Sequence, residues 1–287
     1  MCQKSALGAG AAMVITNLQN EQIKELAKLH LRKGRQEAGA FLIEGVRFVE
    51  EALKAGAKLE KIVVSPKLPE TDRGQELLDR CRDLGCPILE VEQRVLAKVA
   101  DTENPQGVVA AVAQPRYSWP ELLEETRSTG QSCQETWLVV DGVQDPGNLG
   151  TIIRTAHAAG VSGICLTPGT VDVYNPKALR STMGSVFHLP VLQGLAPQDI
   201  LEEVNSRDWQ VVVGDVTANR EYFQVDFRKR TLLVVGSETQ GPSREFIDGA
   251  THRVRISMPG GAESLNVAVA AGILLFEGVR QTRFPCQ

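Results

Sequence analysis

The sequence is poor in aromatic residues and contains no long apolar run. Phe, Trp and Tyr make up 5% of its 287 residues, and no apolar stretch approaches the ~20 residues that a membrane-spanning helix needs. Near the start, Lys4 and a short Gly/Ala stretch stand where a secretory signal would have an apolar core. We therefore expect a cytoplasmic protein without a membrane partner, and we expect residues 1–14 to form a disordered leader.

Cysteine and histidine are also scarce, and their spacing does not fit a metal centre. Cys81 and Cys86 lack the second pair, or the nearby histidines, that a zinc site requires. We expect no metal, and we expect reduced thiols, as in other cytosolic proteins. The four histidines have no Ser or Cys partner at a recognisable spacing, so a hydrolase triad lacks support. The six cysteines stand at positions 2, 81, 86, 133, 165 and 286.

Basic residues are not in excess. The chain has 31 Lys and Arg against 35 Asp and Glu, whereas a protein that coats nucleic acid without specificity needs dense positive charge. One local basic cluster does occur, within residues 28–35. A hydrophobic content of 43% with 23% charged residues is typical of a globular protein, and the length suits two domains.

The first hundred residues predict a compact α/β domain over residues 15–114. Asn20 precedes an amphipathic helix that carries Ile23 and Leu26. Further along, short apolar runs that end at Gly or Pro alternate with helical patterns. A stretch with Pro115, Pro120 and several glutamates then predicts a linker over 115–136, with one short helix at 119–127. The expected strands are 40–44, 61–65, 87–90 and 107–112, and the expected helices are 46–55, 74–84 and 91–99.

A second domain is predicted over residues 137–287. Five apolar strands alternate with helical segments, and this pattern is typical of a mostly parallel sheet covered on both faces. The clearest helices are 149–159 and 265–280. The expected strands are 137–140, 163–166, 210–213, 231–235 and 253–256.

Three segments of this domain begin where a strand ends and continue into glycine and polar residues. Open α/β sheets place their ligand-binding loops at such strand ends. They are 141–154, 235–241 and 256–267. In the first, we expect Asn148 to cap a helix that begins near Leu149. Arg154 is an isolated charge in that helix, and its guanidinium suits a phosphate.

The other two segments combine glycines with single polar residues. Gly236 and Gly241 permit close backbone approach to a ligand, and no Lys follows Gly241, so this is not a phosphate-binding P-loop. On this segment alone Glu238 is a solvated loop acid, and in a ligand pocket it would instead hold Arg154 or Asn266, or lie near a positively charged ligand. Ser264 is the expected N-cap of the last helix, and Asn266, in its first turn, needs a partner.

Together, and in this order, the three segments resemble the signature motifs of the SpoU/TrmH branch of the SPOUT methyltransferases. The resemblance implies methyl transfer from S-adenosyl-L-methionine to a ribose 2′-hydroxyl of RNA. It also implies a deep trefoil knot in the C-terminal domain and a homodimer packed through it, with the pocket near the interface. The implied catalytic residues are Asn148, Arg154, Glu238, Ser264 and Asn266, and the implied cofactor-binding residues are Gly236, Gly241, Ile256, Met258 and Leu265.

Physical chemistry narrows the role of Arg154. The family arginine is described as helping to deprotonate the ribose, but a guanidinium pKa above ~12 makes a poor base at neutral pH. We expect Arg154 to position phosphate and ribose instead. The order Ser257-Met-Pro after Ile256 departs from the commoner Pro-Met of the family.

The N-terminal domain is similar to the L30e-like substrate-binding domain of SpoU-type enzymes. It carries the basic cluster, followed by Phe41 to Arg47 and by the motif at 102–107. Structured ribosomal RNA, most of all 23S RNA, is therefore the preferred substrate. The candidate RNA-binding residues are Arg32, Lys33, Arg35, Arg47, Lys177 and Arg180.

Three alternative functions differ in which of these residues they would need. A transfer RNA 2′-O-methyltransferase would share the chemistry. A catalytically silent RNA-binding or ribosome-assembly protein would keep the fold, but would not need all five catalytic residues. A nucleotide-dependent oxidoreductase would need a Gly-x-Gly-x-x-Gly turn after a strand, which the sequence lacks.

Overall fold

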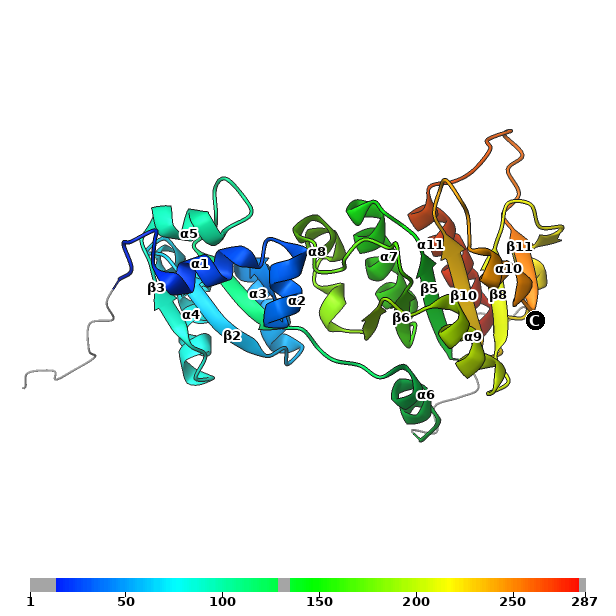
Figure 1. Ribbon diagram of the computed structural model, residues 1–287, viewed down its shortest axis with the longest axis horizontal. Helices are drawn as coiled ribbons and strands as arrows, with labels where there is room; N and C mark the ends of the chain where they lie inside the picture. The colour runs from blue at the N-terminus through cyan, green and yellow to red at the C-terminus, as the bar shows by residue number, and fades with distance from the viewer. Residues whose placement is uncertain (1–13, 129–134, 284–287) are drawn as a thin grey trace, which may run out of the picture. The chain divides into compact units, whose positions relative to one another are not determined.

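A computed structural model describes residues 14–128 and 135–283 of the chain. Most of the predicted leader, together with Cys2, Cys133 and Cys286, lies outside these residues. The chain folds into two compact units, residues 1–114 and 115–287, and each is described here by itself (Figure 1).

The N-terminal unit contains a four-stranded sheet in the order β1-β4-β2-β3. Strand β4 runs antiparallel to β1 and β2, whereas β2 and β3 are parallel. The strands are β1 (Ala40–Glu44), β2 (Leu59–Val64), β3 (Ile88–Glu90) and β4 (Val108–Ala113). The helices are α1 (Glu21–Lys28), α2 (Arg32–Ala38), α3 (Val46–Lys54), α4 (Asp72–Asp83) and α5 (Gln93–Val99), and a 3₁₀ turn, η1, spans Leu68–Glu70.

The core of this unit follows the predicted apolar pattern. Ile23 and Leu26 of α1 pack with Leu96 of α5 against Val63 and Val109 of the sheet. Asn20 caps α1 as predicted, because its side chain accepts a hydrogen bond from the backbone N–H of Gln22. The basic cluster does not lie on a single helix face: Lys28 ends α1, and after a turn Arg32, Lys33 and Arg35 lie on the short helix α2.

The C-terminal unit contains a seven-stranded sheet in the order β7-β6-β5-β10-β8-β11-β9. Every strand pair in it is parallel, which confirms the predicted α/β class. Strands β7 and β9 were not predicted, because runs of two or three residues show no periodicity. The strands are β5 (Thr136–Asp141), β6 (Gly163–Leu166), β7 (Val191–Gln193), β8 (Gln210–Gly214), β9 (Arg220–Glu221), β10 (Thr231–Gly236) and β11 (His252–Arg255).

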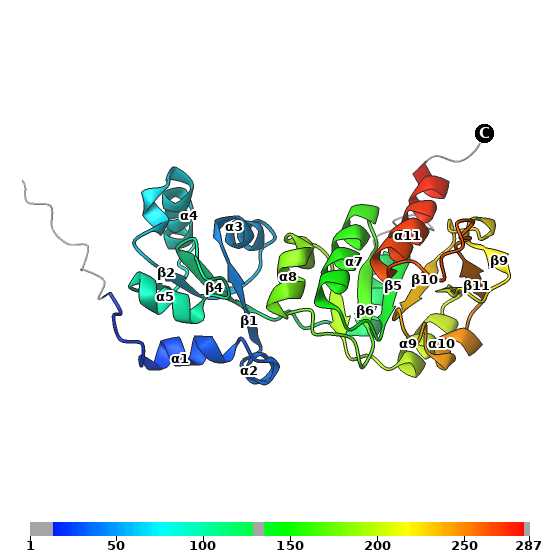
Figure 2. The same ribbon diagram turned by 90° about the horizontal axis from the view of Figure 1, so that it is seen from above.

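Helices cover both faces of this sheet (Figure 2). On one face, Trp137 and Val139 of β5 pack with Leu123, Ile200 and Phe246, which come from α6, α9 and α10. Because side chains alternate along a strand, the other residues of β5 face the opposite layer. That layer holds α8, α7 and α11, and α7 lies between the other two and packs against both. The helices are α6 (Trp119–Ser128), α7 (Pro146–Ala159), α8 (Pro176–Thr182), α9 (Pro197–Asn205), α10 (Arg244–Asp248) and α11 (Val267–Arg283), with 3₁₀ turns η2 (Ser185–Phe187) and η3 (Tyr222–Gln224).

None of the helices in the described ranges is long and apolar enough to cross a membrane. The trefoil knot implied by the resemblance stays a prediction.

Candidate active site

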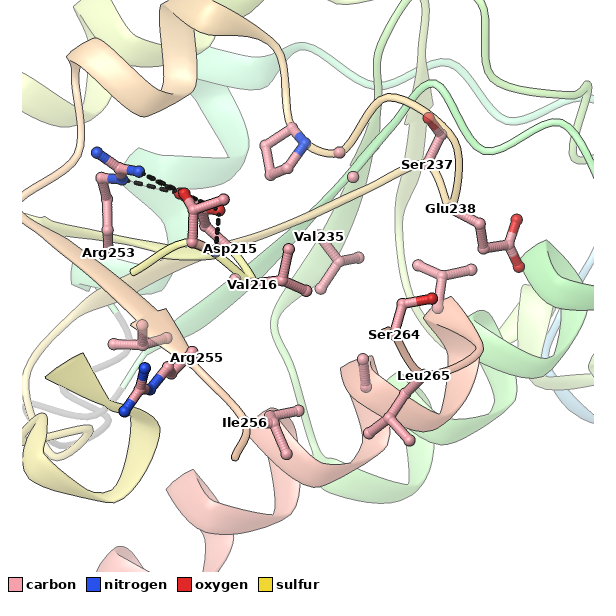
Figure 3. A pocket seen from close by; sticks show the side chains of 18 of the residues that line it. Asp215, Val216, Val235, Ser237, Glu238, Arg253, Arg255, Ile256, Ser264 and Leu265 are labelled. Carbon is pink, nitrogen blue, oxygen red and sulfur yellow. Dashed lines mark hydrogen bonds and ion pairs between the residues drawn. The ribbon is translucent and has the colours of Figure 1, made fainter. Parts of the chain in front are cut away.

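The main pocket of the C-terminal unit lies where β8, β10 and β11 run out into loops (Figure 3). Its volume is about 460 Å³, within the ~300–1,000 Å³ that small-molecule sites usually have. The pocket is lined by Ile247 and by residues from four segments, 214–217, 235–242, 253–258 and 264–274. All five predicted cofactor residues, Gly236, Gly241, Ile256, Met258 and Leu265, are among them.

Glycine at position 236 is required by close backbone packing. A Cβ atom there would lie 2.0 Å from the backbone nitrogen of Pro242, far inside van der Waals contact. The loop therefore folds back on the strand end, and Ser237 O accepts a hydrogen bond from Gly241 N at 2.9 Å. Gly241 has a φ of 67°, a conformation that favours glycine. The two predicted glycines together shape one rim of the pocket.

Three predicted catalytic residues meet at one end of this pocket. Asn148 Nδ2 donates a hydrogen bond to Glu238 Oε1. Asn266 Nδ2 donates to Asn148 Oδ1 at 3.0 Å and lies 3.5 Å from Glu238 Oε1. Residues 118 positions apart in the sequence thus share one hydrogen-bonded group. Of the two partners predicted for Glu238, the structure brings Asn266 to it, but not Arg154.

The helix starts that hold these residues differ from the predictions. Helix α7 begins at Pro146, and its N-cap is Asp145, whose carboxylate accepts from Asn148 N at 2.8 Å. The predicted cap role of Asn148 was therefore wrong, and its side chain is free to reach Glu238. The hydrogen bond from the Asn148 N–H is the main cause that lowers the pKa of Asp145, so this cap is charged and suits the helix dipole.

The predicted cap of the last helix was also wrong. Helix α11 begins at Val267, and Asn266 caps it: its Oδ1 accepts from Ala268 N at 3.0 Å and from Val269 N at 3.3 Å. These two bonds fix which side of the amide is oxygen, so the Nδ2 group points to Asn148 and Glu238. Ser264 is exposed and lines the pocket near Glu238 (Figure 3).

Arg154 does not join this group. It lies six residues after Asn148 on α7, and such a spacing corresponds to ~9 Å along the helix and a rotation of ~120°. Its side chain is exposed. Arg154 is therefore presented to the surroundings of the C-terminal unit, not to Glu238 of the same chain.

The far end of the pocket has two acid–arginine pairs that the sequence did not reveal. Arg253 donates through Nε to Asp215 Oδ2 at 2.9 Å, and Arg255 donates through Nε to Glu221 Oε1 at 2.8 Å. Both arginines line the pocket. A signal was present: arginines two residues apart on a strand lie on the same face.

Both acids are held in the charged form. Burial raises the pKa of Asp215, but hydrogen bonds from Thr217 and Arg253 outweigh it and hold the pKa below the usual value. Hydrogen bonds from Ser257 and then Arg255 lower the pKa of Glu221. The acid side chains keep only 9% and 16% of their exposure, against 43% and 44% for Arg253 and Arg255.

S-adenosylmethionine fits the residues that are present. The middle of the pocket is apolar, with Val235, Ile256 and Leu265 around it (Figure 3), and it suits an adenine ring. The glycine rim leaves backbone groups accessible, as a ligand held through the main chain requires. Asn148, Glu238 and Asn266 then stand at the end where a reacting group would be presented.

The candidate RNA-binding residues are in different environments. Arg32, Lys33 and Arg47 are exposed on the N-terminal unit. Arg35 is 4% exposed and donates to the carbonyls of Leu29 and His30 at 2.9 and 2.8 Å. Its guanidinium supports the α1–α2 turn, so the prediction of an RNA contact for Arg35 has to be revised.

The two basic candidates on α8 are both exposed. Lys177 Nζ lies 3.4 Å from Asp145 Oδ2, which links the start of α8 to the start of α7. Arg180 follows within the same helix.

Within residues 14–128 and 135–283, no group of three or more His, Cys, Asp or Glu side chains is arranged to hold a metal ion. Cys81, Cys86 and Cys165 are free thiols. Burial, followed by the neighbouring Cys86, raises the pKa of Cys81 to about 11, so this thiol is protonated and unreactive at neutral pH.

A parallel α/β sheet with a glycine-rimmed pocket and an Asn–Glu–Asn group at its mouth defines a class, that of S-adenosylmethionine-dependent RNA 2′-O-ribose methyltransferases. Residues 135–276 match the SpoU rRNA Methylase family, and residues 20–110 match the MRM3-like substrate binding domain. The chain belongs to the SpoU rRNA methylase family.

Individual relatives agree over nearly the whole chain. An uncharacterized tRNA/rRNA methyltransferase of Synechocystis is 38% identical and covers 93% of both chains. The 23S rRNA (guanosine(2553)-2′-O)-methyltransferase RlmP of Bacillus subtilis is 34% identical over 91% of this chain and 97% of its own. The AdoMet-bound rRNA methyltransferase structure from Sinorhizobium meliloti superimposes with a TM-score of 0.81 and 32% identity, covering 96% and 100% of the two chains.

Proposed function

We propose that this enzyme methylates a ribose 2′-hydroxyl of 23S ribosomal RNA in the cytoplasm. The observation that carries the proposal is the hydrogen-bonded group of Asn148, Glu238 and Asn266 at the mouth of a cofactor-sized pocket. Support for the substrate comes from the N-terminal match to a substrate binding domain and from the activity named for the B. subtilis relative. RNA is distinguished from DNA because DNA lacks the reacting hydroxyl.

The reaction depends mainly on alignment. S-adenosylmethionine supplies an electrophilic methyl group on a positively charged sulfur. Asn148 and Asn266 fix Glu238 through their amide donors, so that the carboxylate keeps one orientation at the pocket mouth. From there Glu238 orients the ribose hydroxyl and accepts its proton, directly or through water, as a general base does.

The exposed cations bind the RNA backbone. Arg32, Lys33 and Arg47 are assigned to the N-terminal unit's RNA surface, and Lys177 and Arg180 to the surface of α8. Because phosphate contacts position RNA without reading its sequence, these residues set affinity and orientation. Arg154 grips the phosphate next to the target ribose, bidentately and without acting as a base.

The enzyme acts as a homodimer that buries the outer face of α11. Val269 and Phe276 stand seven residues apart on this helix, and they are 52% and 48% exposed. Exposed large apolar side chains on one helix face mark an interaction surface. A partner packed there lies beside α7 as well, because α7 and α11 are in contact.

Transfer of radiolabelled methyl from S-adenosylmethionine tests the function. Unmodified 23S RNA, 16S RNA, transfer RNA and large-subunit particles are offered in parallel, followed by nucleoside analysis. We expect label in a 2′-O-methyl nucleoside of 23S RNA, either naked or in the particle. Label in transfer RNA alone would mean that the substrate is transfer RNA and not 23S RNA. No label in any pool, with cofactor binding intact, would indicate a silent RNA-binding protein.

A further inference from the structure

A carboxylate outside the cofactor pocket holds one of the pocket walls. Glu221 stands on β9, and β9 pairs with β11 through Glu221 and Arg255. Its Oε1 accepts from Ser257 Oγ at 2.7 Å and from Arg255 Nε at 2.8 Å. These two donors flank Ile256, which lines the pocket. One carboxylate oxygen of Glu221 thus accepts hydrogen bonds from the residues on both sides of Ile256.

The wall needs such an attachment because it leaves regular structure at this point. Strand β11 ends at Arg255, and residues 256–266 form no helix or strand before α11 begins. Ile256 and Met258 of this stretch line the pocket. An irregular segment loses conformational entropy when a ligand orders it, and that loss weakens binding.

The environment of Glu221 makes its two bonds hard to replace. Within the described parts of the chain, its Oε2 is buried and has no hydrogen-bond partner. The charge is therefore met at Oε1, and removal of the Ser257 hydroxyl leaves Arg255 to hold a largely covered carboxylate. The donors hold the pKa of Glu221 below its usual value, Ser257 more than Arg255, so the acid is charged at neutral pH.

We propose that Glu221 is a positioning residue for S-adenosylmethionine: through Ser257 and Arg255 it fixes the wall formed by Ile256 and Met258 and so sets cofactor affinity. Glu221 does this from behind the wall, since the pocket lining contains Arg255 and Ile256 but does not extend to Glu221 among the described residues. Its effect is confined to binding, because the group around Glu238 lies at the other end of the pocket (Figure 3).

The test compares Ser257→Ala with Ser257→Thr, which restores a hydroxyl. Ser257→Ala removes one bond to a charged acceptor, and we expect calorimetry to show about tenfold weaker binding of S-adenosylmethionine. Hydrogen exchange without cofactor should be faster at the amides of 256–258. The KM for S-adenosylmethionine should rise while kcat at saturation stays near that of the wild type. Ser257→Thr should recover most of the affinity.

Glu221→Gln supplies a second variant, which keeps the shape and loses the charge, and Glu202→Gln is its matched control. Glu202 is an exposed acid on α9, a helix that contributes no described residue to the pocket lining. Wild-type affinity and wild-type exchange in Ser257→Ala would overturn the proposal, as would a Ser257→Thr variant as weak as Ser257→Ala. Failure of the wild type to bind S-adenosylmethionine would instead refute the pocket assignment on which the proposal rests.

Discussion

The two ends of the cofactor pocket are built from different interactions. At one end, Asn148 in the first turn of α7, Glu238 in the loop after β10 and Asn266 at the start of α11 are joined by amide–carboxylate and amide–amide hydrogen bonds at the surface. At the other, Asp215 and Glu221 are covered acids paired with arginines of the neighbouring strand β11. On the proposed roles the two ends divide the work: the end that anchors the cofactor rests on covered acids, and the end that reacts stays open to RNA.

The two ends also differ in whether one chain supplies all of their residues. The anchoring end is made of Asp215, Glu221, Arg253, Arg255 and Ser257, which lie on or directly after the neighbouring strands β8, β9 and β11. The reacting end draws on α7, β10 and α11, and the exposed Arg154 faces away from it. On the homodimer proposal, Arg154 completes the reacting end of the partner chain.

Substitution of Arg154 gives the largest expected effect. Arg154→Ala should lower methyl transfer by about 10³-fold, the scale of losing a preorganised charge contact, and should leave cofactor binding near normal. Co-expression of Arg154→Ala with Asn148→Ala as tagged mixed dimers separates the two arrangements. If Arg154 acts on the partner, each mixed dimer keeps one intact site, and a random mixture recovers about a quarter of wild-type activity.

The same experiment can contradict the proposal in two ways. Mixed dimers without activity would mean that Arg154 serves the pocket of its own chain. Cofactor binding that falls together with methyl transfer would mean that Arg154 belongs to the anchoring end, which would break the division of labour. Sedimentation of the wild type checks the dimer itself.

Glu238 carries the next largest effect. Glu238→Ala removes the shared acceptor of Asn148 and Asn266, and we expect kcat to fall by about 10²-fold with a small change in cofactor affinity. Glu238→Gln keeps an oxygen for both amides but cannot accept a proton. A Gln variant as slow as the Ala variant supports proton transfer to Glu238. A Gln variant near wild-type rate would restrict Glu238 to positioning.

The sequence predicted the regular parts of the fold because they repeat. Strands of four or more buried residues and helices with apolar periodicity were found, and the parallel sheet followed from their alternation. The short edge strands β7 and β9 escaped, since two or three residues carry no period. The cap of α1 at Asn20 was predicted correctly, but those of α7 and α11 were not. Asp145, Asn148, Ser264 and Asn266 are all suitable cap residues, and only the folded chain shows which ones bond to the first turn.

The site was predicted unevenly for the same reason. Glycines and polar residues at strand ends located the pocket, because backbone geometry requires them there. The partner of Glu238 was left open between Arg154 and Asn266, since the choice depends on how α7 is rotated. The RNA contact predicted for Arg35 has to be revised, because the sequence does not distinguish a buried guanidinium from an exposed one. The pairs at Asp215 and Glu221 were missed because their partners come from strands whose neighbours only the sheet order reveals.

Asp215→Asn should have the smallest effect, and it is one on stability. Removing the charge weakens the bonds from Arg253 and Thr217, and we expect the free energy of unfolding at pH 7 to fall by about 1 kcal/mol, after discounting for partial exposure. The folded pKa of Asp215 lies below its ordinary value. Its stabilisation is therefore fully present above about pH 5, beyond the unfolded pKa of ~3.9, and is lost as pH falls through the folded pKa.

Urea unfolding of wild type and Asp215→Asn at several pH values measures this difference. Asp248→Asn is the matched control: Asp248 also pairs with an arginine, at 3.3 Å, but both side chains are exposed, at 67% and 89%. The control should change stability by less than ~0.5 kcal/mol at any pH, as exposed pairs do. If Asp215→Asn behaved like the control, the covered pair would add no more than a surface pair. The anchoring end would then owe its shape to strand pairing and to the bonds of Glu221, and not to the Asp215–Arg253 pair.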